Sequence, residues 1–160
     1  MNKKVLSVLV DNTSGELNRV AGLFSRRGYN IDSLTVGVTQ DPRYSRMTIV
    51  VTGDDDIIEQ IIKQIEKLVD VNKVEVLEDN NSVCRELILT KVKTTPEQRQ
   101  QVMAVADIFR AKIVDVGIDS LIIELTGNQN KLDAFLNLLA DYEILELVRT
   151  GITGLARGTK

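Results

Sequence analysis

The sequence predicts an α+β protein made of two tandem domains of the same kind. The predicted order of elements, strand–helix–strand–strand–helix–strand, occurs once in the first half of the 160 residues and again in the second. Hydrophobic residues make up 43% of the chain and charged residues 27%, which is typical of a globular protein. We expect residues 1–78 to form the first domain and residues 83–160 the second, each large enough for a modest core.

The first half alternates short apolar runs with a helical pattern. Residues 4–10 are rich in Val and Leu and predict a strand. Residues 16–27 predict a helix, because their apolar residues recur at positions i, i+3, i+4 and i+7. Gly28 ends this helix, since a left-handed glycine is a common helix stop. Residues 31–39 and 45–52 follow as two strands joined by a turn.

A second helix begins at three consecutive aspartates, Asp54, Asp55 and Asp56, and carries an isoleucine-rich apolar stripe. These carboxylates suit a helix N-terminus, because they complement the helix dipole; a metal site is the weaker alternative. Residues 71–77 predict the closing strand of the domain. The polar residues 78–82 predict a linker.

The second half repeats this order. Residues 85–92 predict a strand, and T-P-E-Q at residues 95–98 has the pattern of a capping box with proline at the first helical position. The helix that begins there is followed by strands over residues 112–116 and 121–126, a helix over residues 132–139 and a last strand over residues 143–149. The glycine-rich end, T-G-I-T-G-L-A-R-G-T-K, matches no phosphate-binding motif, so a docking tail or strand extension explains it better than a phosphate loop.

The topology of each domain follows from the order of its elements. A βαββαβ unit closes as a four-stranded antiparallel sheet with both helices on one face, the ferredoxin-like arrangement. The other face and the edge strands stay uncovered, and with so many Val and Ile residues this would favour aggregation. We therefore expect these surfaces to pair, either between the two halves or between two chains.

The residues needed for most catalytic centres are missing from the sequence. The chain has no histidine and a single cysteine, Cys84, so it lacks His-based triads and His or thiolate metal sites. Neither G-x-x-x-x-G-K-[ST] nor G-x-G-x-x-G occurs. We expect no enzyme activity from this chain alone, and no catalytic or metal-binding residues in it.

The composition also argues against a nucleic-acid or membrane partner. The net charge is −3 and aromatic residues make up 4% of the chain, so neither a basic surface nor a base-stacking platform is indicated. The apolar runs are far shorter than the roughly 18 residues of a membrane span, and no signal peptide is recognised. A lone cysteine suits a reducing compartment, so we expect a cytoplasmic protein.

The start of the first helix, V-D-N-T-S-G-E-L-N-R-V at residues 10–20, contains more than a helix needs. Thr13 and Glu16 have the spacing of a capping box, which would satisfy two backbone N–H groups. The box requires neither Asn12 nor Gly15, and glycine inside a helix costs roughly 1 kcal/mol relative to alanine. A glycine permits close approach to the backbone, a helix N-terminus favours a carboxylate, and an asparagine amide both donates and accepts. A site for an α-amino acid is therefore a candidate beside the purely structural interpretation.

One exposed helix start is too weak a site by itself. A helix terminus stabilises an anion by about 0.3–1 kcal/mol, whereas even millimolar affinity needs about 4 kcal/mol. The helix exit offers an amide, Asn30, beside an apolar residue, Ile31. It lies roughly 18 Å from the helix start along the helix axis. It would reach the site only from a second chain.

The chain also resembles a known family. The block V-L-S-V-L-V-D-N-T-S-G-E-L-N-R-V-A-G-L-F-S-R-R-G-Y-N-I-D-S-L-T-V is similar to the small, regulatory subunit of acetolactate (acetohydroxyacid) synthase. So are the stretches S-R-M-T-I, K-L-V-D-V, R-E-L-I-L, K-L-D-A-F-L and G-L-A-R-G. The resemblance covers nearly the whole chain. It implies an N-terminal ACT domain followed by a second ferredoxin-like domain, and a role in valine, leucine and isoleucine biosynthesis.

The resemblance also implies partners and a ligand. The chain would form a homodimer through its ACT domains, activate a separate catalytic (large) subunit and mediate feedback inhibition by valine. Thiamine diphosphate, Mg and FAD are expected only in that catalytic partner, and no cofactor in this chain. The residues implied to hold valine are Asn12, Gly15, Glu16 and Leu17 of one chain and Asn30 and Ile31 of the other.

Two points limit the site that the resemblance implies. The second half has no equivalent of D-N-T-S-G-E-L, so no second valine site is expected there. An alternative for the whole chain is a ligand-free interaction module, which only activates its partner.

Overall fold

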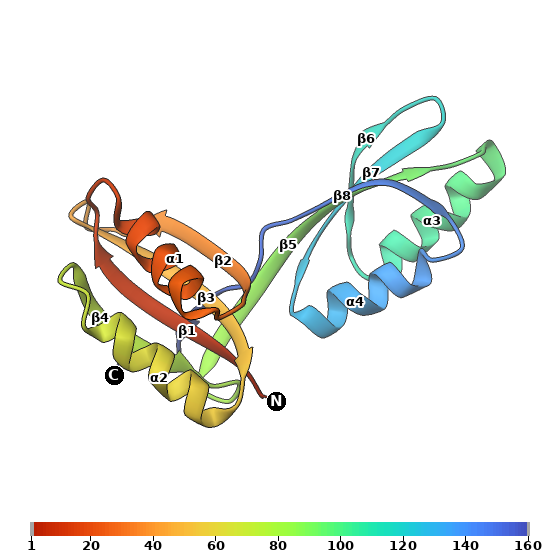
Figure 1. The fold of residues 1–160 in the computed structure, drawn as a ribbon. Coiled ribbons are helices and arrows are strands. Elements are labelled where there is room, and N and C mark those ends of the chain that lie inside the picture. Colours follow the sequence, from red (N-terminus) through yellow and green to blue (C-terminus); the bar gives the residue numbers. More distant parts are fainter. Residues whose placement is uncertain (1, 160) are drawn as a thin grey trace. The chain divides into compact units, whose positions relative to one another are not determined.

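The computed structural model describes residues 2–159 and contains two units, each with the order βαββαβ (Figure 1). The first unit takes the chain up to Cys84 together with the residues from Ile152 onward, and the second unit is Arg85–Gly151. Both sheets are antiparallel. The prediction of an α+β fold with two antiparallel sheets and helices packed on them is confirmed.

The first unit contains a four-stranded sheet of order β2-β3-β1-β4, so that β2 and β4 are its edges. Its elements are β1 (Asn2–Asp11), α1 (Glu16–Arg27), β2 (Ile31–Val38), β3 (Tyr44–Gly53), α2 (Asp55–Glu66) and β4 (Val71–Leu77). Gly28 follows α1 in the left-handed conformation, with φ 69°, as predicted for the helix stop.

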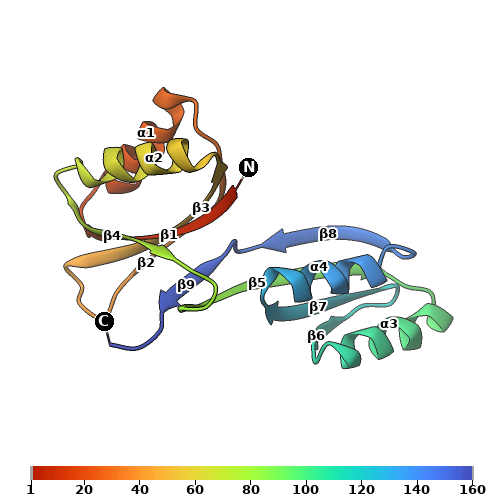
Figure 2. The same ribbon diagram turned by 90° about the horizontal axis from the view of Figure 1, so that it is seen from below.

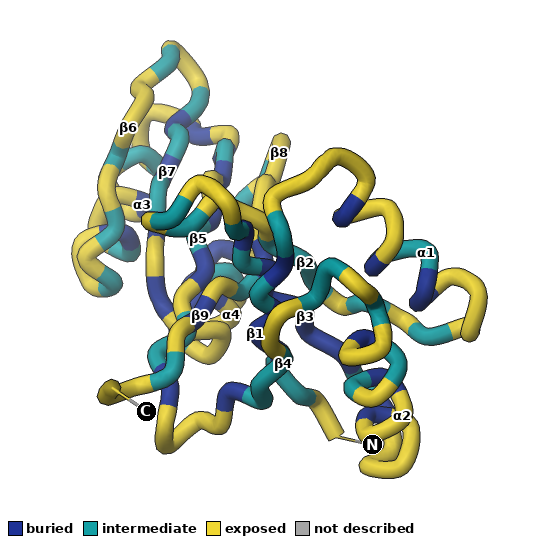
Figure 3. Tube along the Cα trace, turned by 90° about the vertical axis from the view of Figure 1, so that its left-hand side faces the viewer, coloured by how far each residue is buried: buried dark blue, intermediate teal, exposed yellow. Residues whose placement is uncertain are grey.

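Both helices of the first unit cover the same face of this sheet (Figure 2). On β1 the alternate residues Leu6, Val8 and Val10 point toward the helices, because side chains alternate between the faces of a strand. Val20 and Phe24 of α1 pack against them at helical spacing. The pattern of burial along the chain can be followed in Figure 3.

The second unit repeats this design with the strand order β6-β7-β5-β8. Its elements are β5 (Ser82–Lys93), α3 (Pro96–Ile108), β6 (Lys112–Val116), β7 (Ser120–Gly127), α4 (Gln129–Leu138) and β8 (Glu143–Arg149). Val102 of α3 and Phe135 of α4 are fully buried in one core with Ile88 of β5 and Ile123 of β7. Helix α3 therefore takes the place of α1, and α4 the place of α2.

The C-terminal segment lies differently from the expected domain division. It was expected in the second domain, residues 83–160, but the chain from Ile152 onward groups with the first unit. There the short strand β9 (Thr153–Ala156) pairs with β5, which begins in this unit, and contacts β4. The strand-extension interpretation of the glycine-rich end agrees with this pairing. The local sequence pattern did not predict that this segment joins the first unit, because the contacts connect residues about 70 positions apart.

No helix within residues 2–159 is both long and apolar enough to cross a membrane.

Candidate functional site

Helix α1 begins without a side-chain cap. Its first residue is Glu16, and the residue at the N-cap is Gly15, in a left-handed conformation with φ 91°. The predicted capping box of Thr13 and Glu16 is wrong, because the extra turn at Gly15 shifts the cap two residues past Thr13. Thr13 contributes only its backbone carbonyl, which accepts from the Glu16 N–H at 3.4 Å. The first-turn N–H groups therefore gain no hydrogen bond from an N-cap side chain.

The space beside Gly15 is open. A Cβ atom added there would meet no heavy atom within 4 Å, so crowding does not explain the glycine. The positive φ does, since it costs an ordinary L-residue about 1–2 kcal/mol. Gly15 thus has a structural reason that the sequence interpretation missed, and it leaves the helix start accessible.

Asn12 also has structural partners. Its Nδ2 donates to the carbonyl of Pro42 at 3.0 Å, and its Oδ1 accepts from the Ser45 hydroxyl at 3.2 Å. Its backbone N–H donates to the carbonyl of Arg43 at 2.7 Å. The side chain therefore ties the loop before α1 to the turn between β2 and β3. An amide has two N–H groups and two acceptor lone pairs, so one donor and one acceptor position are still available to a ligand.

Glu16 faces the interior of its unit. The residue is only 3% exposed, and its Oε2 accepts from Arg19 Nη1 at 3.3 Å. Arg19 also forms an ion pair with Asp70, while Oε1 of Glu16 has no hydrogen-bond partner among the described residues. Burial raises the pKa of Glu16, and the nearby carboxylate of Asp70 raises it further, against the opposing effect of Arg19. The Glu16 carboxylate is therefore not presented toward solvent at the helix start.

The remaining predicted site residues are found at two separate places. Leu17, on the first turn of α1, is 45% exposed. Asn30 is exposed and Ile31 half-buried, at the start of β2. Ser45, which contacts Asn12, and Val51, which pairs with Ile31, are six residues apart on β3, or about 20 Å at 3.3 Å per residue.

Within one chain, the structure therefore brings Asn12, Gly15, Glu16 and Leu17 together at the start of α1 and places Asn30 and Ile31 elsewhere.

The corresponding helix start in the second unit is closed by capping. The Thr95 hydroxyl accepts from the Gln98 N–H at 3.2 Å, and Oε1 of Gln98 accepts from the Thr95 N–H at 3.0 Å. Pro96 occupies the first helical position and has no N–H. The predicted capping box is confirmed here, and this helix start offers a ligand fewer free N–H groups than that of α1.

The three aspartates at residues 54–56 lie at the start of α2, as predicted, but the Asp54 side chain forms no capping hydrogen bond. Asp54 is the N-cap residue, and Asp55 and Asp56 lie in the first turn. No group of three or more metal-binding side chains is placed to hold a metal ion in the part of the chain that the structure describes.

Sequence reasoning did not identify Asp70 as a neighbour of the site. Arg19 follows Glu16 by three residues, which is a recognisable spacing for an ion pair on a helix. Asp70 lies 51 positions away from Arg19 and only the fold brings it close.

Comparisons with known proteins were made for the whole chain. A family model described as "AHAS small subunit-like ACT domain" matches residues 6–73, and one described as "Small subunit of acetolactate synthase" matches residues 85–158. A probable acetolactate synthase small subunit of Archaeoglobus fulgidus is 52% identical over 99% of both chains. The acetolactate synthase isozyme 3 small subunit of Escherichia coli is 48% identical, over 99% of this chain and 98% of its own. The crystal structure of an acetolactate synthase small subunit from Thermotoga maritima matches all of both chains with a TM-score of 0.91 and 44% identity.

Proposed function

Because the chain belongs to the acetolactate synthase small-subunit family, we propose that it is the regulatory, non-catalytic subunit of that enzyme, which activates a catalytic subunit and mediates feedback inhibition by valine. In this role it acts in the cytoplasm, in the biosynthesis of valine, leucine and isoleucine. Thiamine diphosphate, Mg and FAD belong to the catalytic partner, which carries out the reaction. This chain supplies the effector site.

The observation that carries the effector site is the open start of α1. The helix begins at a left-handed glycine with open space beside it and with no capping side chain. The backbone N–H groups there suit the carboxylate of an amino acid, since a helix N-terminus favours a negative charge. The unused donor and acceptor positions of Asn12 would bind the two charged ends of the ligand. The exposed Leu17 would contact its aliphatic side chain.

The second half of the site comes from a second copy of the chain. The edge strand β2 has a neighbour on one side only and exposes Val36 and Val38. In Figure 1, α1 lies toward the β2 side of the sheet and α2 toward the β4 side. A two-fold axis next to β2 would pair the two edges as one continuous antiparallel sheet and set the two α1 helices antiparallel. The N-terminus of one α1 then faces the C-terminal end of the other, where Asn30 and Ile31 follow.

The residues have different roles in this site. Gly15 and Leu17 line it through backbone and apolar contact, and Asn12 and Asn30 provide the polar side chains. Glu16 contributes its backbone position and pairs with Arg19, because its carboxylate is buried.

Calorimetric titration of the full chain with valine tests the effector site. We expect binding in the wild type, its loss in Gly15→Asp and its retention in Gly15→Asn. Asp and Asn have the same shape and both tolerate a positive φ, so the pair isolates the effect of a negative charge placed beside the ligand carboxylate. Absence of binding in the wild type would contradict the effector site and favour the ligand-free module. Equal affinities of the two variants would contradict the placement of the carboxylate.

The dimer is tested by sedimentation of a variant at the edge strand. Val36 is 46% exposed on β2, and Val36→Lys puts a charge at the proposed contact, where two copies would place like charges together. We expect a monomer that binds valine weakly, because half of each site is lost. The matched control is Val148→Lys, at an exposed position of β8 that is far from β2 in the sequence. A Val36→Lys dimer of wild-type strength would rule out pairing through β2.

A further inference from the structure

The segment Ile152–Arg157, called here the return segment, is held by side chains of β2. The Ile152 N–H donates to the Ser33 hydroxyl at 3.3 Å, and the Thr35 hydroxyl donates to the Ile152 carbonyl at 3.5 Å. Ser33 and Thr35 are two positions apart and therefore point to the same face of the strand. Together they bind both polar groups of a single backbone residue, much as a neighbouring strand would.

This face of the sheet is the one away from the helices. Ser33 and Thr35 are paired with Val50 and Thr48 of β3, whereas the residues of β3 that pack on the helices are the alternate ones. The predicted uncovered face thus carries part of the chain's own C-terminal segment.

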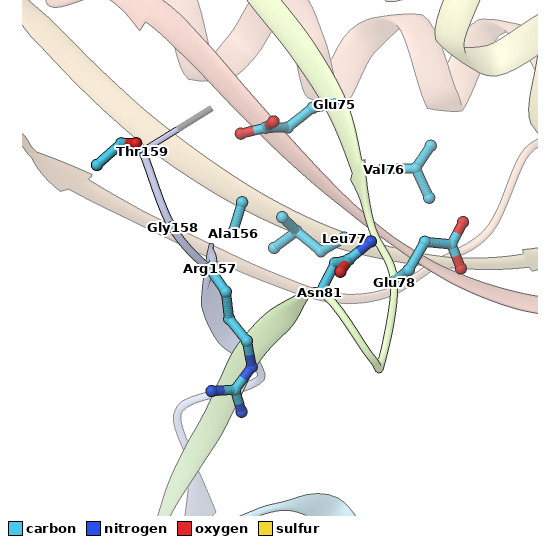
Figure 4. A pocket seen from close by; sticks show the side chains of 9 residues that line it. All are labelled: Glu75, Val76, Leu77, Glu78, Asn81, Ala156, Arg157, Gly158 and Thr159. Atoms are coloured by element: carbon cyan, nitrogen blue, oxygen red, sulfur yellow. The ribbon is translucent and has the colours of Figure 1, made fainter.

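The far end of the return segment packs near the other edge of the same sheet. Gly154 fits closely, since a Cβ there would lie 2.6 Å from Cys84 Sγ and 3.0 Å from Leu77 Cδ1. The Arg157 N–H donates to the carbonyl of Asn81 at 2.6 Å. Beyond this contact the segment borders a cavity of about 570 Å³ along β4, shown in Figure 4. The return segment therefore has contacts on the side of β2 and on the side of β4.

The strand β2 changes register between the proposed effector site and this contact. The pairing of β2 with β3 shifts between Ile31 and Ser33, which leaves Asp32 as an extra residue. The Thr52 hydroxyl of β3 donates to the Asp32 carboxylate. Bulges of this kind re-aim the side chains around them and recur next to functional sites. A change in the backbone position of Ile31 would therefore be passed to Ser33 through a short irregular segment. A continuous ladder of hydrogen bonds does not connect the two residues.

From this geometry we propose that Ser33 and Thr35 are positioning residues, which transmit effector binding at Asn30 and Ile31 to the return segment. This inference rests on the proposed valine site. Valine would act only through a different affinity for two arrangements of β2, one that holds Ile152 and one that releases it. The hydroxyls of Ser33 and Thr35 hold Ile152 in one arrangement and not in the other. The mobility of the return segment therefore distinguishes the two arrangements.

Hydrogen exchange of the full chain, with and without millimolar valine, tests the proposal. In the wild type, valine should change the exchange rate of amides within Ile152–Arg157 by about fivefold or more. The double variant Ser33→Ala/Thr35→Val should still bind valine, with an affinity that changes by no more than this coupling factor, but show no valine-dependent change in this segment. The swapped variant Ser33→Thr/Thr35→Ser keeps both hydroxyls and should restore the response.

A second readout uses the complex with the catalytic subunit. The double variant should still activate that subunit, while the valine concentration for half-inhibition rises about fivefold or more. An unchanged valine response of both exchange and inhibition in the double variant would overturn the proposal. Failure of the wild type to bind valine would instead overturn the effector site, and calorimetry on the same samples separates the two results.

Discussion

At the scale of single residues, Glu16 is the most constrained side chain near the helix start. It is buried, and it shares Arg19 with Asp70. One of its two carboxylate oxygens accepts from Arg19, and the other has no hydrogen-bond partner within residues 2–159. An unpaired oxygen of a buried carboxylate costs free energy, which protonation relieves. Glu16 therefore makes the stability of the first unit depend on pH.

The variant Glu16→Gln should change this pH dependence. The pKa of Glu16 in the folded protein is raised above its ordinary value of 4.5, first by burial and then by Asp70. The folded chain thus holds the proton more tightly than the unfolded chain. The resulting stabilisation is complete below the unfolded-state pKa and is lost as the pH rises through the raised pKa. The free energy of unfolding of the wild type, relative to Glu16→Gln, should fall over that range.

Urea unfolding at a series of pH values measures this difference. Glu66→Gln, at an exposed position of α2, is the control for a neutralised glutamate without burial. A wild-type minus Glu16→Gln difference that stays constant from acid to neutral pH would contradict the assigned cause.

At the scale of elements, the starts of α1 and α3 differ although each contains a capping pattern in the sequence. At α3 the pattern forms the box, since Thr95 is itself the N-cap residue. At α1 the helix starts only after Gly15, and the Thr13 side chain does not cap it. The start of α1 is determined by Gly15, which has a positive φ. The spacing of residues in the sequence does not reveal this conformation.

Two matched alanine variants distinguish these helix starts. Thr95→Ala should lower the free energy of unfolding by about 0.5–2 kcal/mol, because the hydroxyl that accepts from the Gln98 N–H is lost. Thr13→Ala should change it by less than about 0.5 kcal/mol, since an exposed side chain without a cap is removed. Chemical denaturation of both variants measures this contrast. A Thr13→Ala cost as large as that of Thr95→Ala would mean that Thr13 caps α1 in solution.

At the scale of the whole molecule, the return segment makes the first unit discontinuous in sequence. Gly154 is the point of closest packing, where an added Cβ would meet Cys84, Leu77 and the backbone of Val83. The backbone oxygen of Val83 lies 3.1 Å from that position and cannot give way as a flexible side chain would.

The variant Gly154→Ala should therefore loosen the return segment. We expect a loss of about 1–3 kcal/mol in the free energy of unfolding, from overpacking at a close contact, and faster proteolysis after Gly151. Gly37→Ala is the matched control, because a Cβ at Gly37 meets nothing within 4 Å. Proteolysis of Gly154→Ala at the rate of Gly37→Ala would show that the segment is not held there.

Local periodicity and contiguous motifs were enough to predict the repeated βαββαβ order, most element bounds and the family. Strand β4 (Val71–Leu77) and strand β6 (Lys112–Val116) begin and end where their apolar patterns predict. The tertiary structure alone decided three other features. These are the left-handed start of α1, the burial of Glu16 beside Asp70, and the return of the chain after Gly151 to the first unit.

The physical reason is the range of the interactions. Hydrophobic periodicity and the capping box of α3 involve residues within a few positions of one another, so they can be predicted along the chain. The distant partners of Asn12, Arg19 and Ile152 lie 30 to 119 positions away, and such contacts exist only after the strands have paired. The V-D-N-T-S-G-E-L stretch accordingly predicts where a helix starts. Only the fold shows that this helix start has no capping side chain and has open space beside Gly15.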